Sequence, residues 1–361
     1  MRLGTCIALE LAVAVGAVGG MWFGVGEGRR LVGEYLTTHE ASAATTQRAL
    51  EVPALVPRGE LTVAAPEGPR TVFEAPDDVL LAPLGASPVT RLKLNHGGTS
   101  LSLRVDFANG ARAAFKPEQV HPQSDPRREI AAYKLDRLLG IGRVPPAKAT
   151  TLALDELLAA IEPSHRTFVG NRLRDEAIAQ GGALRGELSW WIPELKVAKL
   201  GRVRIDEKDG RDLWTAYLQV GAPIPEDARP LVAQIAALVM FDVLIDNPDR
   251  WTGGNTVTSP DGGTLYFMDN TMSFSNLAFG GEQNLTAFRK IQVFPRGLVQ
   301  RIRALTPEML DRAFAIDPDH GLGPLLSEVQ KQAVLARRDN MLRHIDRLIV
   351  EHGADAVLAL P

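Results

Sequence analysis

The chain has 361 residues, of which 45% are hydrophobic and 23% charged, a composition typical of a globular protein with a sizeable core. Its formal net charge is -3 and it contains no lysine- or arginine-rich run, which argues against nucleic acid as a partner. Cys6 is the single cysteine, so the folded part has neither a disulfide framework nor a thiolate metal site.

The first segment, residues 1–25, is predicted to be a membrane anchor or a signal segment. Residues 3–25 are apolar or small except for Thr5 and Glu10, and a helix of that length spans a hydrocarbon core of about 30 Å. We expect a single-pass membrane protein, with a cleaved signal peptide as the alternative. The flanking charges nearly balance and leave the orientation open. Residues 26–88 are rich in Ala, Pro, Thr and Gly and are predicted to be a linker.

The folded domain begins with a β-hairpin followed by a helix. Alternating apolar residues and an Asn109-Gly110 turn predict two antiparallel strands over residues 101–115. Lys116 closes the second strand. After a polar loop, an Asp-Pro start signal predicts a helix that carries Glu129 in its first turn.

The second half of the domain combines a buried helix with a second hairpin. A strand is predicted over residues 188–195, and the apolar run 231–245 predicts a buried helix too short to cross a bilayer. A polar loop with Asp249 follows this helix. Asn255 begins a hairpin that delivers Asp269 at a strand end, and the remainder of the chain is predicted to be helical.

Taken together in this order, the polar residues of the first half indicate a nucleotide site of the kinase type. Gly97 and Gly98, just before the first hairpin, would let backbone amides approach phosphate. The Lys116 ammonium would neutralise phosphate charge, and Glu129 would orient that lysine or reach a metal ion. Taken alone, a lysine such as Lys116 is more often a solvated side chain, and a glutamate such as Glu129 is more often a favourable charge in the first turn of a helix.

The second half supplies the remaining parts of such a site. Asp249 would accept the proton of the acceptor hydroxyl, and Asp269 with Asn255 would hold the divalent ions that bridge the phosphates. Asp249 and Asn255 are six residues apart, whereas typical protein kinases have five, so Asn247 is the alternative ligand.

At these residues the chain resembles the secretory-pathway kinases that include the four-jointed kinases and the Golgi casein kinase. The resemblance spans about residues 89–349 and implies ATP and Mg²⁺ or Mn²⁺ as cofactors. It also implies that Trp191 and Ile192 belong to an adenine-facing hinge. The chain lacks the cysteines of the animal members and would be a cysteine-poor, bacterial-type relative. The motifs that carry it are 115–117, 129–133, 135–139, 143–146, 186–193, 241–247 with 249–250, and 268–270, and residues 288–289 and 293–294 fit the family's following helical region.

The fold implied is an α+β, two-lobed protein-kinase-like fold. Residues 89–195 would form a small β-rich N-lobe with one key helix, and residues 196–361 a mainly helical C-lobe. The function implied is ATP-dependent transfer of the γ-phosphate to a hydroxyl of a protein or glycan. A phosphoinositide-type lipid kinase and a nucleotide-binding pseudokinase scaffold are the alternatives, and the oligomeric state is not predicted.

Overall fold

A computed structural model of the chain describes residues 71–73, 75–95, 99–252, 254–315 and 321–361. These residues belong to one compact unit, Ala65–Pro361. The predicted glycine turn at Gly97 and Gly98 lies outside the described residues.

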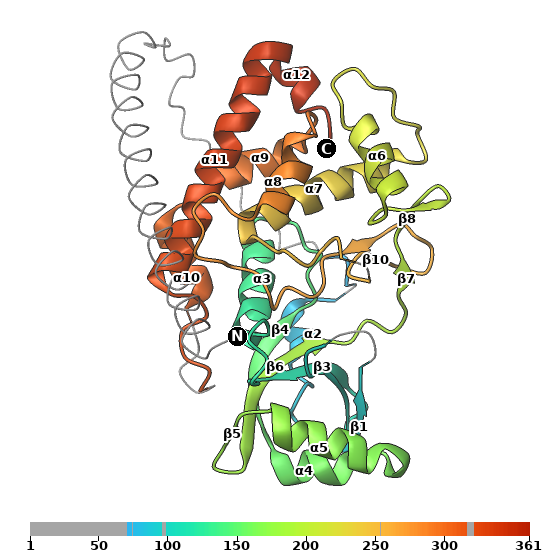
Figure 1. The fold of residues 1–361 in the computed structure, drawn as a ribbon, viewed down its shortest axis with the longest axis vertical. Helices are drawn as coiled ribbons and strands as arrows, with labels where there is room; N and C mark the ends of the chain where they lie inside the picture. Colours follow the sequence, from blue (N-terminus) through green and yellow to red (C-terminus); the bar gives the residue numbers. More distant parts are fainter. Residues whose placement is uncertain (1–70, 74, 96–98, 253, 316–320) are drawn as a thin grey trace, which may run out of the picture. The chain divides into compact units, whose positions relative to one another are not determined.

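A six-stranded antiparallel sheet forms the smaller half of this unit (Figure 1). The predicted hairpin is confirmed as β2 and β3, and its turn at Gly110 has a φ of 86°, a left-handed conformation that glycine adopts without strain. Five strands follow one another across the sheet in the order β1-β2-β3-β6-β4, and β5 pairs with β6. The strands are β1 Val89–Leu94, β2 Leu103–Phe107, β3 Arg112–Pro117, β4 Ala147–Ala153, β5 Ala179–Gln180 and β6 Ala183–Trp190.

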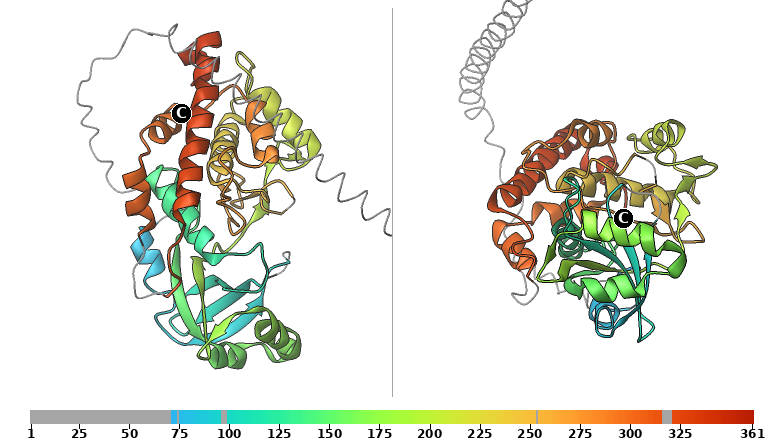
Figure 2. Two further views of the ribbon diagram at one scale, coloured as in Figure 1. Left: turned by 60° about the vertical axis from the view of Figure 1, so that its left-hand side comes forward. Right: turned by 60° about the horizontal axis from the view of Figure 1, so that its bottom comes forward.

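The two faces of this sheet have different partners. On one face, side chains such as Phe115 and Leu188 pack in an apolar cluster with the helices α4 (Leu154–Ala160) and α5 (Arg166–Glu176), which Figure 2 shows lying together against the sheet. Because side chains alternate along a strand, the neighbouring Lys116 projects from the other face. That face is the one next to α3 (Pro126–Leu138).

Helices form the larger half, around a core that also includes α3 and β4. The predicted buried helix is confirmed as α7 (Arg229–Ile245), in which 13 of 17 residues are buried because apolar side chains surround it on all sides. The other elements are α6 Lys208–Tyr217, α8 Glu282–Arg289, α9 Arg296–Arg303, α10 Pro307–Phe314, α11 Glu328–His352, α12 Ala354–Val357, η1 Pro163–His165, β7 Lys196–Val197, β8 Lys199–Leu200, β9 Val203–Arg204, β10 Val257–Thr258 and β11 Leu265–Tyr266.

The C-terminal end of the predicted linker packs against the domain. It contains the short helix α2 (Asp77–Leu81), and Phe73 and Leu84 nearby are 4% and 1% exposed. Asp77 accepts hydrogen bonds from the Tyr133 hydroxyl at 3.0 Å and from Arg137 Nε at 2.7 Å, both on α3. The composition of residues 26–88 does not predict these contacts, because they depend on a few apolar and acidic side chains within a Pro- and Ala-rich stretch.

The predicted membrane localisation, and with it the membrane as a partner, is corrected. In the part of the chain that the structure describes, no helix is both long and apolar enough to cross a bilayer. α7 is apolar but has 17 residues, whereas α11 has 25 residues but many charged side chains, and a span needs about 20 mostly apolar ones. Residues 3–25, on which the prediction rested, lie outside the described residues.

Candidate active site

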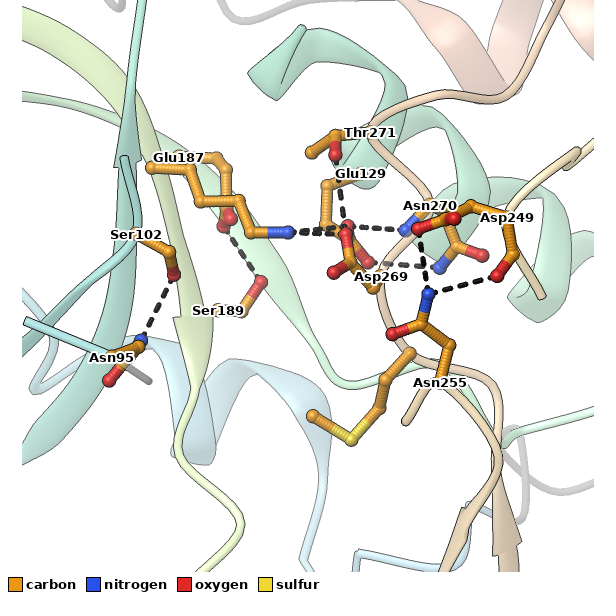
Figure 3. Close-up of polar contacts among 12 residues, drawn as sticks. Asn95, Ser102, Glu129, Glu187, Ser189, Asp249, Asn255, Asp269, Asn270 and Thr271 are labelled. Carbon is orange, nitrogen blue, oxygen red and sulfur yellow. Dashed lines mark hydrogen bonds and ion pairs between the residues drawn. The ribbon is translucent and has the colours of Figure 1, made fainter. Parts of the chain in front are cut away.

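Three of the predicted residues meet on the face of the sheet next to α3, and Figure 3 labels two of them, Glu129 and Asp269. Lys116, at 8% exposure, is the penultimate residue of β3 and places its Nζ 2.7 Å from Oδ1 of Asp269, which follows β11. The same Nζ lies 3.7 Å from Oε2 of Glu129 on α3. Residues that are 153 positions apart in sequence are thus joined by one ion pair.

Glu129 has a second partner that the sequence analysis missed. Its position is fixed by the start of α3, where Asp125 accepts a hydrogen bond from the backbone N–H of Arg127 at 3.0 Å and caps the helix. The Glu129 carboxylate accepts bonds from the backbone N–H of Asn270 at 2.7 Å and from its Nδ2 at 2.9 Å. Glu129 therefore orients the segment that carries Asp269 as well as lying near Lys116.

Asp269 is held in an unusual backbone conformation and keeps a solvent-accessible side chain. Its φ is 57°, and its side chain is 44% exposed. Lys116 and the hydroxyl of Thr271 both donate to Oδ1, which leaves Oδ2 without a hydrogen bond from the described residues. The charge of Lys116 lowers the pKa of Asp269 despite the cost of desolvation, so the carboxylate is ionised.

Burial alone would lower the pKa of Lys116. The charges of Asp269 and Glu129 outweigh that effect and hold the pKa above its usual value, so the ammonium keeps its proton. The lysine is therefore a permanent positive charge in a site where phosphate could be bound.

A loop after α7 brings the second group of predicted residues together. α7 ends at Ile245, and the φ of 54° at Asp246, the C-cap, turns the chain out of the helix. Asp249 donates its backbone N–H to Oδ1 of Asn247 at 3.0 Å, and its Oδ2 accepts a bond from Asn255 Nδ2 at 2.8 Å. The six-residue spacing between Asp249 and Asn255 therefore does not separate them.

Arg250 connects this loop with the segment around Asp269. It is fully buried, and its Nε lies 3.1 Å from Oδ2 of Asp242 on α7. Its other nitrogens donate to Oδ1 of Asn270 at 2.8 Å and to the backbone oxygens of Asn255, at 3.2 Å, and of Met268. Burial raises the pKa of Asp242 to about 6, although Arg250 opposes the shift. In the sequence, Arg250 stands out only as the end of a motif, because a loop arginine gives no sign of being buried.

Glu187 is a second residue that the sequence analysis did not single out. It lies on β6 directly opposite Lys116 and is 1% exposed. The hydroxyl of Ser189 donates to its Oε2 at 2.7 Å (Figure 3). Burial, followed by the charge of Glu129, raises the pKa of Glu187 to about 8.

The predicted hinge residues follow β6, which begins five residues earlier than the expected strand and ends at Trp190. Arg104 of β2 stacks over the Trp191 ring at 5.6 Å. Ile192 is buried in a small cluster with Phe73 and Tyr266. The two residues thus lie where the sheet gives way to the helical half.

The oxygen ligands in this site suit a divalent cation that takes its remaining ligands from phosphate. Within the described residues, no three carboxylate, histidine or cysteine side chains form a cage that could hold a metal ion by themselves. Mg²⁺ and similar ions at nucleotide sites take one or two protein carboxylates and obtain further ligands from phosphate and water. The free Oδ2 of Asp269 fits this kind of ligation.

These features define a kinase-like site: a strand lysine and a helix glutamate on the sheet, and two aspartates in loops of the helical half. The solved structure of the Golgi casein kinase with Mn/ADP bound has the same fold, with a TM-score of 0.60 at 19% identity over 78% of each chain. The predicted α+β, two-lobed kinase-like fold is therefore confirmed.

The sequence comparisons agree with the fold. No protein-family model matches the chain. The human glycosaminoglycan xylosylkinase is 24% identical over 338 residues, which cover 80% of each protein. The human pseudokinase FAM20A is 24% identical over 321 residues, covering 76% of this chain and 59% of that protein. The relatives are thus proteins of the Fam20 family of secretory-pathway kinases, one of them a pseudokinase, and the resemblance expected from the sequence is confirmed.

Proposed function

We propose that this chain is an ATP-dependent kinase that transfers the γ-phosphate to a hydroxyl group of a protein or glycan acceptor. The observation that carries the proposal is the buried Lys116 ammonium, held between Asp269 and Glu129 beneath the sheet. A buried, permanently charged lysine next to an ionised aspartate is what binding of a metal-nucleotide complex requires. The relatives include a xylosylkinase, which supports a hydroxyl acceptor.

ATP would be bound by the sheet and the hinge. Lys116 would contact the phosphates, Glu129 would hold the segment that carries Asp269, and Trp191 and Ile192 would border the adenine. The proposed contribution of Gly97 and Gly98 to phosphate binding remains an expectation from the sequence.

A divalent ion, Mg²⁺ or Mn²⁺, would be held by Asp269 and Asn255. When bound, it would neutralise charge on the transferring phosphate. Asn255 uses its Nδ2 to bond Asp249, which leaves its amide oxygen available for a cation. Asn247 suits this role less well, because its amide oxygen accepts a backbone N–H and its Nδ2 donates to the backbone oxygen of Asp269 at 3.1 Å. The Mn/ADP complex of the Golgi casein kinase supports this choice of cofactors.

Asp249 would act as the general base for the acceptor hydroxyl. Asn255 bonds its Oδ2, and the hydroxyl of Thr252 bonds its Oδ1. These two donors fix the orientation of the carboxylate. A fixed base removes the proton of the acceptor as the oxygen attacks the phosphate.

The test is phosphotransfer from ATP with Mn²⁺ or Mg²⁺ to protein and glycan acceptors, using the full chain. Asp249→Asn should keep most of the affinity for Mn·ADP while turnover falls by about 10² to 10⁴, the range for a positioned base. Asp269→Asn should lose both binding and turnover, since the cation loses its carboxylate ligand.

Asp355→Asn is the matched control, because the Asp355 side chain is fully exposed and, among the described residues, pairs with the half-exposed Arg296. Full activity of Asp249→Asn would contradict the base. Nucleotide binding without any phosphotransfer in the unaltered chain would favour the pseudokinase scaffold, and transfer only to a lipid acceptor would favour the lipid kinase.

A further inference from the structure

Glu187 is a buried carboxylate next to the nucleotide lysine, and none of the roles above uses it. It pairs directly with Lys116 across β6 and β3, so both side chains project from the same face of the sheet. Ser189 bonds its Oε2, whereas Oε1 is buried and has no hydrogen-bond partner among the residues that the structure describes. A buried polar oxygen without a partner destabilises the fold, and such atoms often mark a functional position.

The Lys116 ammonium loses its present ion partner when a cation that accompanies the nucleotide binds Asp269. In this structure its ammonium bonds Oδ1 of Asp269, the residue assigned to the cation. Glu129 is the next carboxylate, at 3.7 Å, and both of its oxygens already accept bonds from Asn270. If a cation takes Asp269, the lysine loses its nearest protein anion, and the Glu129 carboxylate that remains is shared with Asn270.

We propose that Glu187 is a positioning residue that accepts the Lys116 ammonium when a metal-nucleotide complex occupies Asp269. The Cβ atoms of directly opposed strand residues lie about 5 Å apart, so rotation of the lysine side chain suffices to bring Nζ to Oε1. The free oxygen would then be paired, and the ammonium would be held at the phosphates. This inference rests on the proposed function, because it requires the cation at Asp269.

The charges around Glu187 give it a further signature. Lys116 faces it from β3, Glu129 from α3 and Asp269 from the end of β11, while its partner on β4 is the uncharged Ala149. Burial and the charge of Glu129 raise the pKa of Glu187 from 4.5 to about 8. A raised pKa means that the folded state favours the protonated form. The stability that this form contributes is therefore lost as the pH rises through about 8.

The experiment compares Glu187→Gln with Glu118→Gln in the full chain. Glu118 is also buried, but its carboxylate pairs with Arg127 and with Arg185, the latter at 2.6 Å. Titration calorimetry gives the affinity for Mn·ADP, and thermal unfolding without nucleotide gives the stability from pH 5 to pH 9. We expect Glu187→Gln to weaken Mn·ADP about tenfold, as for the weakening of one charge-assisted hydrogen bond.

Without nucleotide, Glu187→Gln should melt no lower than the unaltered chain at pH 5 and higher at pH 9, because it cannot ionise. Glu118→Gln should show the opposite pattern, a lower melting temperature with unchanged affinity. In a Lys116→Met background the effect of Glu187→Gln on affinity should disappear, since Glu187 acts through the lysine.

Unaltered Mn·ADP affinity in Glu187→Gln would overturn the inference. A loss of affinity that is additive with Lys116→Met would also overturn it, because it would indicate a direct contact between Glu187 and the cation. A melting temperature that falls as in Glu118→Gln would overturn it as well. Failure of the unaltered chain to bind Mn·ADP would instead refute the proposed function itself.

Discussion

Replacing Arg250 by methionine tests whether one buried guanidinium holds the loop after α7 and the Asp269 segment together. Arg250 is fully buried and donates to Asp242, Asn270 and two backbone oxygens. Methionine keeps much of the side-chain length and removes the charge and every donor. Asp242, at 1% exposure, would be left as a buried carboxylate without a countercharge.

The expected loss in the free energy of unfolding is about 3 to 5 kcal/mol, the range for breaking one side of a buried ion pair. It is a large part of a typical stability of about 5 to 15 kcal/mol. The loss in the free energy of unfolding should grow with pH, because it depends on the ionisation of Asp242. Its pKa is already raised to about 6 by burial, and removing Arg250 removes the charge that opposes this shift. At pH 5 the carboxyl group takes up a proton and the penalty shrinks, whereas at pH 8 the penalty is full.

Urea unfolding at pH 5 and pH 8, with phosphotransfer measured on the same samples, is the assay. Arg204→Met is the matched control. Its partner Asp206 is likewise buried, at 5% exposure, but the Arg204 side chain is 35% exposed and solvent screens the pair, so the loss should be much smaller than for Arg250→Met. Equal losses in the two variants, or a loss for Arg250→Met that does not grow with pH, would refute the reasoning.

Two further predictions concern the nucleotide lysine and the segment behind the hinge. Lys116→Met should weaken Mn·ADP binding at least tenfold in calorimetry, because an apolar thioether cannot supply positive charge to the phosphates. Unchanged affinity would place the nucleotide elsewhere. Phe73→Ala should lower the free energy of unfolding by about 3 kcal/mol, since its buried ring packs 5.7 Å from Trp190 and 5.9 Å from Tyr266. Phe279→Ala, at a position 68% exposed, should change it by less than about 0.5 kcal/mol in the same urea titration.

The parts of the fold that the sequence predicted are those set by local signals. The apolar run that became α7 allowed no amphipathic alternative, and the Asn109-Gly110 turn fixed the β2-β3 hairpin because few residues adopt its left-handed backbone. The α3 start was equally clear, since Asp125 caps the helix that carries Glu129. Spacing along the chain then placed the lysine, the glutamate and the aspartates in the order that a kinase site needs.

The parts that the sequence did not predict depend on contacts between distant segments. Glu187 occupies a polar position of a strand, where alternation alone predicts an ordinary solvated side chain, and only the approach of α3 buries it. Arg250 follows a helix in a polar loop, and its burial results from the return of the segment with Met268 and Asn270. Both residues have partners many positions away in the sequence, so no local pattern predicts their burial.

The same long-range packing determines which form of the nucleotide the site can accept. Glu129, Glu187 and Asp269 place three carboxyl groups around the single ammonium of Lys116. The pKa of Glu187 is raised to about 8, which favours its protonated form, and Glu129 and Asp269 still outnumber the ammonium, although the charge of Arg250 also lowers the pKa of Asp269. A nucleotide without a cation would add several negative charges to this excess in a partly desolvated site, where such repulsion is strong. The site therefore favours a nucleotide that arrives with its divalent ion, and the exposed side of Asp269 is where that ion would enter.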